Sequence, residues 1–264
     1  MPTRIHSLFE RLKGERRAAL IAYVTAGDPT PERTPGIVAA LERGGVDLIE
    51  LGVPFSEPIA DGPVIQRGAE RALRAGTNVV KVLEIARKIR EHSEIPILLF
   101  TYLNPVLRYG LEKLAADAKA AGIDGCLLTD LSVEEAESYM GAMRSAGLDT
   151  VFLAAPTSTD ARLKLVAKYS TGFVYLVSRT GVTGERSALS EALAPLIERT
   201  RAVTALPLAA GFGISTPEQA GVVAKMADGV VVGSAIVRLI EKNASDTELE
   251  AFAHSLRDKL SWRA

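Results

Sequence analysis

Two carboxylates stand at unusual places in the stretch DLIELGVPFSEPIADGPVIQ, which runs from Asp47 to Gln66. Glu50 interrupts an apolar run typical of a β-strand, and Asp61 follows in a loop rich in proline and glycine. An acid inside a strand is rarely a packing choice, because burial of an unpaired carboxylate costs several kcal/mol. The pair therefore indicates acid and base chemistry on a common substrate.

Each acid also has a purely structural interpretation. Glu50 could belong to a buried ion pair. Asp61 could serve a turn, or cap the helix that begins in GPVIQ. The sequence leaves both interpretations open.

Other residue types add little to this chemistry. The three histidines, His6, His92 and His254, fall in predicted helices away from strand ends, which argues against a histidine base or a histidine-ligated metal. Every lysine falls in a predicted helix or at its end, so none is a strand-borne Schiff-base candidate. The single cysteine, Cys126, lies in the apolar run GCLL and is expected to be a buried, inert thiol. Without a disulfide framework, we expect a cytoplasmic location.

Glycine-rich segments predict a phosphate site. Gly211, Gly213 and Gly233 follow two predicted strands and let backbone N–H groups approach an anion closely. Ser234 opens a helix, and a helix N-terminus favours negative charge. A third segment, GVTG at Gly181–Gly184, has the length of an active-site lid, although a surface loop is the alternative.

Short apolar runs alternate with helical stretches along the whole chain. The runs begin near Leu20, Leu48, Ile97, Gly125, Thr150, Phe173, Leu206 and Gly229. Eight such units predict an α/β fold closed into a (β/α)8 barrel, the TIM-barrel architecture, with a doubly wound sheet as the alternative. Gly45, Gly122 and Gly147 each precede an apolar residue, an aspartate and a strand, and are predicted to be left-handed helix stops. TRIHSLFERLKG and TELEAFAHSLRDKL predict an extra helix at each end.

The bulk composition is that of an ordinary globular protein. The 264 residues are 47% hydrophobic and 24% charged, and we expect one barrel domain over residues 1–264. The net charge of −1 gives no reason to expect nucleic acid or an anionic membrane as a partner. No apolar stretch has the length of a membrane span.

Six motifs together carry a resemblance to a known family. In chain order they are YVTAGDP, ELGVPFSEPIADGPVIQ, TYLNPVLRYG, VYLVSRTGVTG, GFGIS and GSAIV, and they are spread along nearly the whole chain. The chain resembles the tryptophan synthase α chains. The resemblance implies retro-aldol cleavage of indole-3-glycerol phosphate to indole and glyceraldehyde 3-phosphate, for tryptophan biosynthesis.

The resemblance also implies roles for particular residues. Glu50 would protonate the indole carbon that leaves, or shuttle that proton, and Asp61 would hold the indole N–H and stabilise positive charge on the ring. Thr183 would bond Asp61 when the lid closes. The other substrate-binding positions implied are Tyr23, Tyr102, Tyr175, Gly184, Phe212, Gly213, Gly233 and Ser234. The chemistry implied needs neither a metal nor a cofactor in this chain.

The family resemblance further implies a partner, a pyridoxal-phosphate β chain that receives indole in an α2β2 heterotetramer. The docking surface would be two exposed loops, Pro54–Pro58 and Asn104–Tyr109. Glu57 departs from the family, which usually has aspartate there. Two other functions stay open: a phosphosugar isomerase on the same barrel, and a non-catalytic regulatory subunit that binds phosphate ligands.

Overall fold

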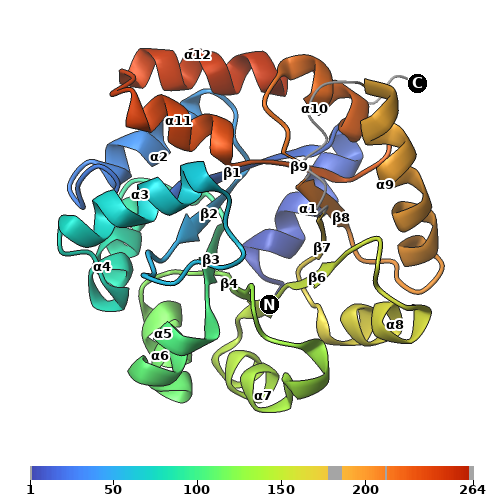
Figure 1. Ribbon diagram of the computed structural model, residues 1–264, viewed down its shortest axis with the longest axis horizontal. Helices are drawn as coiled ribbons and strands as arrows, with labels where there is room; N and C mark the ends of the chain where they lie inside the picture. Colours follow the sequence, from blue (N-terminus) through green and yellow to red (C-terminus); the bar gives the residue numbers. More distant parts are fainter. Residues whose placement is uncertain (1, 178–185, 212, 262–264) are drawn as a thin grey trace.

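The computed structural model describes residues 2–177, 186–211 and 213–261, except for the side chains of residues 186–192. Within these residues nine parallel strands form one sheet (Figure 1). The strands are β1 Ala19–Thr25, β2 Leu48–Gly52, β3 Ile97–Thr101, β4 Gly125–Leu128, β5 Asp149–Thr150, β6 Phe152–Ala154, β7 Val174–Val177, β8 Leu208–Gly211 and β9 Gly229–Val232. Their order is β5-β4-β3-β2-β1-β9-β8-β7-β6.

The ring closes through the chain itself. β5 and β6 stand at the two ends of the strand order, yet only Val151 separates them. They are two pieces of one barrel strand, the first pairing with β4 and the second with β7. Across the interruption, the hydroxyl oxygens of Thr171 and Ser170 accept hydrogen bonds from the N–H groups of Thr150 and Phe152, at 3.0 and 3.3 Å. The predicted eight-stranded barrel is confirmed, with its fifth strand in two pieces.

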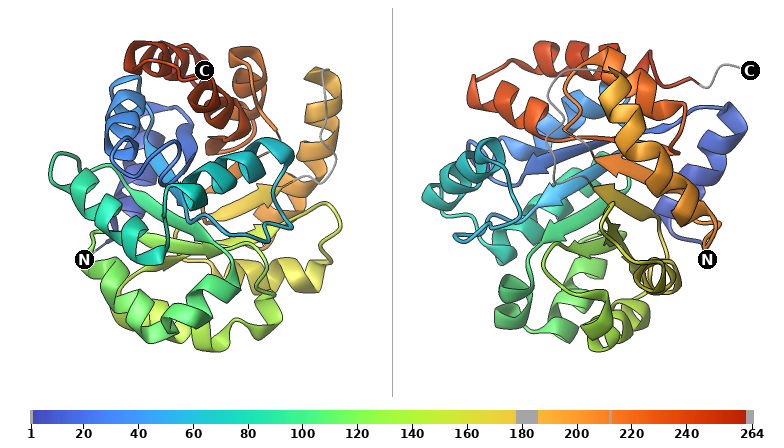
Figure 2. Two further views of the ribbon diagram at one scale, coloured as in Figure 1. Left: turned by 60° about the vertical axis from the view of Figure 1, so that its left-hand side comes forward. Right: turned by 45° about the vertical axis from the view of Figure 1, so that its right-hand side comes forward.

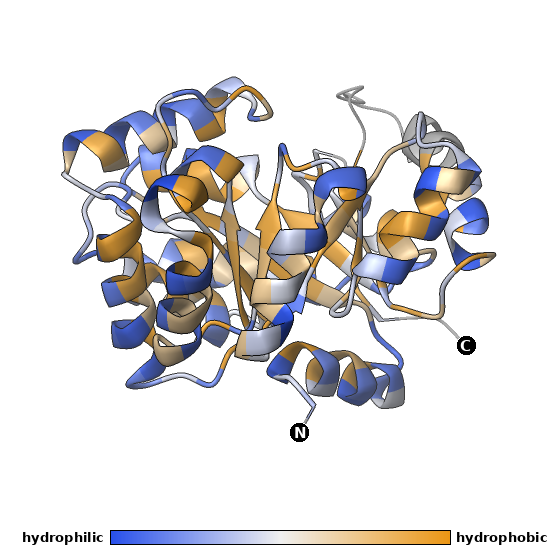
Figure 3. Ribbon diagram, turned by 90° about the horizontal axis from the view of Figure 1, so that it is seen from below, coloured by the Kyte–Doolittle hydropathy of each residue, from blue (hydrophilic) through white to orange (hydrophobic). Residues whose placement is uncertain are grey.

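Helices surround the strands on the outside of the ring, as the views in Figure 2 show. They are α1 Arg4–Glu15, α2 Thr34–Arg43, α3 Pro63–Arg74, α4 Val79–Arg90, α5 Leu103–Tyr109, α6 Leu111–Ala120, the 3-10 helix η1 Val133–Glu135, α7 Glu137–Ala146, α8 Asp160–Tyr169, α9 Arg186–Arg201, α10 Pro217–Ala224, α11 Ser234–Glu241 and α12 Asp246–Arg257. The extra helices predicted at the two ends are α1 and α12. α1 differs from the others, because it lies across one end of the strands (Figure 3).

The helix α1 closes the barrel interior at that end. Its buried residues Ile5, Leu8, Phe9 and Leu12 share a cluster with inward-facing strand residues. The Phe9 ring packs on Phe173, with ring centroids 5.7 Å apart. The opposite, carboxyl end of the strands is left for the loops, which is where barrels of this type carry their sites.

The repeated glycine and aspartate have a common structural basis. Gly45, Gly122 and Gly147 have φ values of 93°, 81° and 67°, which confirms them as left-handed helix stops. The aspartate that follows bonds the neighbouring strand: Asp47 accepts from the Leu20 N–H and Asp124 from the Ile97 N–H, both at 2.9 Å. The first two repeats therefore each end one helix and bond to an adjacent strand, whereas Asp149 of the third repeat accepts from the Thr171 hydroxyl at 2.8 Å.

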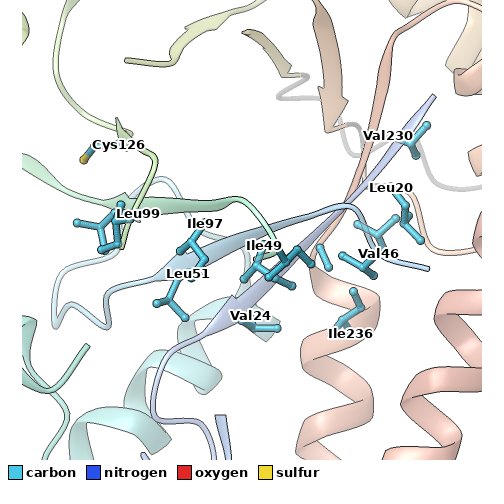
Figure 4. Close-up of a cluster of buried hydrophobic side chains, with 14 of the residues drawn as sticks. Leu20, Val24, Val46, Ile49, Leu51, Ile97, Leu99, Cys126, Val230 and Ile236 are labelled. Atoms are coloured by element: carbon cyan, nitrogen blue, oxygen red, sulfur yellow. The ribbon is translucent and has the colours of Figure 1, made fainter. Parts of the chain in front are cut away.

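Side chains alternate along each strand between the helix layer and the barrel interior. Ile49 and Leu51 of β2 join the outer core with Leu99 and Val24 (Figure 4). Leu48 belongs to the inner cluster instead. Because the period is two, Glu50 shares the inner face with Leu48.

One predicted loop is a helix. Asn104–Tyr109 lies within α5, which begins directly after β3, with Pro105 in its first turn, where proline is tolerated. Val106 is only 1% exposed and packs in the outer core, so the prediction that it is exposed is wrong. The same holds for Pro54, which is buried at the barrel rim.

Candidate active site

Three site residues predicted from the sequence lie on the inner face of the barrel. Tyr23 of β1 stands opposite Glu50 of β2 in the parallel register. Tyr175 of β7 is two residues beyond Phe173, which belongs to the inner cluster. The same period-two phase thus brings the three side chains from distant parts of the sequence into one space.

Glu50 is buried without a partner. It is 1% exposed, and neither carboxylate oxygen has a hydrogen-bond partner in the described residues. Burial disfavours the charged form and raises the pKa of Glu50 to about 8. The structural ion pair considered above is absent from the described part of the chain.

Asp61 lies two residues before α3 but does not cap it, since Gly62 is the N-cap residue. Its Oδ2 instead accepts a hydrogen bond of 2.9 Å from the Tyr102 hydroxyl. The same hydroxyl oxygen accepts from the Ala60 N–H at 3.1 Å. Burial raises the pKa of Asp61 to about 6, and the Tyr102 hydrogen bond opposes that rise. The capping interpretation is therefore wrong for this carboxylate.

Electrostatic coupling shows that these groups form one cluster. Burial raises the pKa of the Tyr175 phenol well above its usual range, and the charges of Glu50 and Asp61 add to the effect. Burial also raises the pKa of the Tyr23 phenol, with the charge of Asp61 as the next cause. The pKa of Tyr102 rises for the same two reasons. Two carboxyls and three neutral phenols therefore share the barrel mouth.

Phe100 also lines this site, and it was not among the residues predicted from the sequence. It lies on the inner face of β3, half-buried, with its ring edge-on to Tyr23 at a centroid distance of 5.2 Å. Its position two residues before Tyr102, which directly follows β3, was the signal available. An aromatic edge and face at this place suit a flat apolar ring of a ligand.

Two glycines make room for the tyrosine rings. A Cβ on Gly52 would lie 2.3 Å from the Tyr23 hydroxyl oxygen, and one on Gly211 would lie 2.6 Å from that of Tyr175. Real Cβ atoms do not approach so closely. Gly211, predicted only as an anion-approach glycine, thus also sets the position of Tyr175.

Replacement of Gly211 with alanine is expected to displace Tyr175 and destabilise the protein by about 1–3 kcal/mol, the usual cost of overpacking. Denaturant unfolding measures it. The matched control is Gly141→Ala within α7, where a Cβ meets nothing within 4 Å and alanine should stabilise the helix by about 0.5–1 kcal/mol. Equal stability of the two variants would contradict the steric argument.

Part of the predicted phosphate site lies within the residues that the structure describes. Gly213 has φ 69°, and the space beside it is open. Gly233 is the N-cap of α11 and Ser234 is the first helical residue. The first N–H groups of a helix have no partner within it, so this end can bind an anion. Thr183, Gly184 and Phe212 lie outside the described residues, as does the predicted lid segment Gly181–Gly184.

Several further predictions can be checked against the described residues. His6 and His254 lie in α1 and α12 as predicted, whereas His92 lies in the turn after α4. Cys126 is buried, and burial raises the pKa of its thiol to about 12. The described residues contain no group of three or more His, Cys, Asp or Glu side chains arranged to hold a metal ion. Among the same residues, no helix combines the length and apolarity needed to cross a membrane.

Comparison with known proteins assigns the family. The family model described as tryptophan synthase alpha chain matches residues 9–260. The tryptophan synthase alpha chain of Solibacter usitatus is 68% identical, with 99% of this chain and 100% of that protein covered. That of Geotalea uraniireducens is 50% identical, with 92% and 91% covered. A tryptophan synthase structure from Mycobacterium tuberculosis superposes with a TM-score of 0.92 at 38% identity, covering 100% of both chains. The chain belongs to the tryptophan synthase alpha chain family.

Proposed function

We propose that this chain cleaves indole-3-glycerol phosphate to indole and glyceraldehyde 3-phosphate, with Glu50 as the proton donor and acceptor and Asp61 as the electrostatic partner of the indole ring. The observation that carries the proposal is the pair of desolvated carboxyls beside three phenols at the barrel mouth. Their pKa values, about 8 and about 6, lie on opposite sides of neutral pH. Such a split assigns one group as acid and the other as anion.

Glu50 begins the reaction as an acid. With a pKa of about 8 it is protonated at neutral pH and can donate its proton to the indole carbon that carries the side chain. The lack of a hydrogen-bond partner in the described residues leaves that proton available to substrate. Protonation turns the ring into an electron sink.

Asp61 stabilises the ring in its protonated form. With a pKa of about 6 it is ionised at neutral pH, and it would accept a hydrogen bond from the indole N–H. A fixed carboxylate in a site of low dielectric strongly favours positive charge on the ring. The hydroxyl of Tyr102 holds this carboxylate and favours its charged form.

Carbon–carbon cleavage then returns the proton. Ionised Glu50 takes the proton of the hydroxyl group next to the ring, and that oxygen forms the new C=O bond. The carbon–carbon bond breaks, and its electron pair restores the neutral indole. The products are indole and the aldehyde, atoms and charges balance, and Glu50 ends protonated as it began.

The remaining proposed contacts hold the two ends of the substrate. The N–H groups around Gly213, Gly233 and Ser234 would bind the phosphate, where each charge-assisted hydrogen bond is worth about 1.5–3 kcal/mol. Tyr23 and Phe100 would pack against the indole. By family resemblance, Gly184 and Phe212 would complete the phosphate site and Thr183 would bond Asp61. Tyr175 would complete the substrate wall beside Glu50.

The pH dependence of indole release tests the assignment. In the isolated chain, kcat/KM should follow a bell with an acid limb near pH 6, where Asp61 protonates, and a base limb near pH 8, where Glu50 loses its proton. The substrate phosphate also titrates near pH 6, roughly. Tyr102→Phe distinguishes the titration of Asp61 from that of the phosphate. Loss of the Tyr102 hydrogen bond raises the pKa of Asp61, so an acid limb that belongs to Asp61 moves to higher pH while the base limb stays in place.

Four outcomes of this assay test the function and the roles of the two carboxyls. Indole release with the predicted bell supports the proposal. Isomerisation of a phosphosugar without indole release would favour the isomerase alternative. Ligand binding without turnover would favour a regulatory subunit. A flat profile between pH 5 and 9 with full turnover would refute the roles of the two carboxyls.

The family, named for an alpha chain, implies a beta-chain partner. Our proposal is that this partner carries pyridoxal phosphate, takes up the indole and forms an α2β2 heterotetramer, while this chain works without a cofactor. The proposal includes a cytoplasmic location for tryptophan biosynthesis, which the single buried cysteine fits.

The proposed docking surface is centred on a groove of about 380 Å³ between the segment after β2 and α5. Phe55, Val80, Pro105 and Arg108 are among its lining residues. Around it, Val80 is 51% exposed and Leu107, on α5, 60% exposed, and Ile59 of the same β2–α3 loop is 83% exposed. Large apolar side chains so exposed favour burial by a partner.

Replacement of Leu107 with aspartate is expected to weaken association with the beta chain about tenfold or more, while indole release by the isolated chain stays at the wild-type rate. Arg108→Glu should act in the same direction. Sedimentation or calorimetry with the beta chain gives the affinity. The control is Ala251→Asp, which adds the same charge on the exposed face of α12. Wild-type affinity in both groove variants would show that the partner docks elsewhere.

A further inference from the structure

An ion-pair chain joins three elements behind the candidate site. Asp28, in the loop after β1, is fully buried. Arg71 of α3 donates two hydrogen bonds to its carboxylate, from Nε to Oδ1 and from Nη2 to Oδ2, both 2.8 Å long. Its Nη1 donates to Glu241 of α11 at 3.0 Å. One side chain of α3 therefore holds both the loop after β1 and the last residue of α11.

Strand β1 and helices α3 and α11 are also packed closely together next to these ion pairs. A Cβ on Gly68 of α3 would lie 3.0 Å from Thr25 Oγ1 and from Val237 Cγ1, so the helix backbone approaches both neighbours tightly. Tyr23, Ile65 and Val237 form a small apolar cluster, with one residue from each of β1, α3 and α11. A shift of α3 would therefore be felt at Tyr23 and at α11.

Each of these elements ends in a group of the proposed site. Asp61 lies two residues before α3, Ser234 begins α11, and Tyr23 lies near the end of β1. One substrate must reach from the carboxylate of Asp61 to the N-terminus of α11. The spacing of α3 and α11 therefore has to match the length of that substrate.

We propose that Arg71 is a positioning residue that fixes Asp61 relative to the phosphate-binding end of α11. The inference rests on the proposed function. Arginine suits the task, because its planar fork binds a carboxylate in one geometry, whereas lysine is a point charge with no fixed direction. The carboxylate of Asp28 is buried and needs a cationic partner, so the pair cannot loosen freely.

The test compares Arg71→Lys with wild type in the isolated chain, well below the melting temperature of both. kcat/KM for indole-3-glycerol phosphate is expected to fall about 10–100-fold, because misplacement of a reacting group by about 1 Å costs on the order of 10²-fold. The affinity for inorganic phosphate should stay at the wild-type value, since phosphate contacts the α11 end alone. A purely stabilising role would not separate the two readouts.

Two further variants complete the design. Arg74→Met is the matched control: Arg74 is on the same helix, but in the described residues it donates to Glu70 of α3 itself, at 3.1 Å, and not to Asp28 or Glu241. Its kcat/KM should equal that of wild type. Glu241→Gln keeps the bond between Arg71 and Asp28 but weakens the contact of α3 with α11. It should lower kcat/KM about three- to tenfold.

The outcomes separate this inference from the proposed function. Wild-type kcat/KM in Arg71→Lys overturns the inference, and so does a parallel loss of phosphate affinity, kcat/KM and melting temperature. If Arg71→Lys does not fold, an unchanged kcat/KM in Glu241→Gln overturns it. If the wild-type chain itself releases no indole, the proposed function fails instead.

Discussion

Replacement of Glu50 with glutamine is expected to lower kcat for indole release by about 10²–10⁴-fold or more. Glutamine keeps the size of the side chain but has no acidic proton to give to the indole carbon. Residue 50 lies on the inner face of β2, because side chains alternate along the strand and Leu48 and Ile49 are buried on opposite faces. Steady-state indole release measures the rate, and calorimetry should show that substrate still binds.

The same change should stabilise the fold, with a defined pH dependence. The pKa of Glu50 rises from 4.5 in the unfolded chain to about 8 in the fold. Its favourable contribution is complete below pH 4.5 and is lost as pH rises to 8, at about 1.4 kcal/mol for each pH unit. Glutamine does not ionise, so the stability advantage of Glu50→Gln over wild type should grow across this window and stay constant above it.

Activity and stability together make the test specific. The exposed Glu91, at the C-terminal end of α4, provides the control, since Glu91→Gln should change neither property. If Glu50→Gln keeps a tenth of the wild-type rate, Glu50 is not the proton donor. If it loses activity and stability at every pH, the loss of rate comes from misfolding and not from chemistry.

Much of the architecture was predictable from the sequence, because its causes are local. Strands appear as short apolar runs, and Gly45, Gly122 and Gly147 were recognisable because only glycine adopts their backbone conformation without strain. The position of Glu50 followed from the period of two. The division of one barrel strand into β5 and β6 was not predictable, since it depends on which neighbour each half pairs with.

The contacts that define the candidate site were mostly not predictable. The hydrogen bond between Tyr102 and Asp61 joins residues 41 positions apart, and it exists because the loop after β2 folds back over the end of β3. The need for glycine at Gly52 comes from the Tyr23 ring on the neighbouring strand. Pro105 favoured a loop in the sequence, yet a first helical turn accommodates proline equally well.

Replacement of Asp61 with asparagine is expected to lower kcat by about 10²–10³-fold, the usual cost of losing one preorganised electrostatic partner of the transition state. Asparagine can still accept the hydrogen bond from Tyr102, so the loop should keep its place and the free energy of unfolding should change little. The acid limb near pH 6 should disappear with the carboxyl, while the base limb of Glu50 remains near pH 8.

Tyr102→Phe is the matched comparison for this prediction, because it removes the hydrogen bond and keeps the charge. If charge is what Asp61 supplies, Tyr102→Phe must lose far less rate than Asp61→Asn at pH values above its shifted acid limb. If instead Asp61 acts only by shaping the loop, both variants should lose rate to a similar degree, and the loop position should change in both. A variant Asp61→Asn that retains the acid limb at its wild-type pH would show that the limb belongs to another group, such as the substrate phosphate. A variant that also keeps the wild-type kcat would show that the ionised carboxylate is not required.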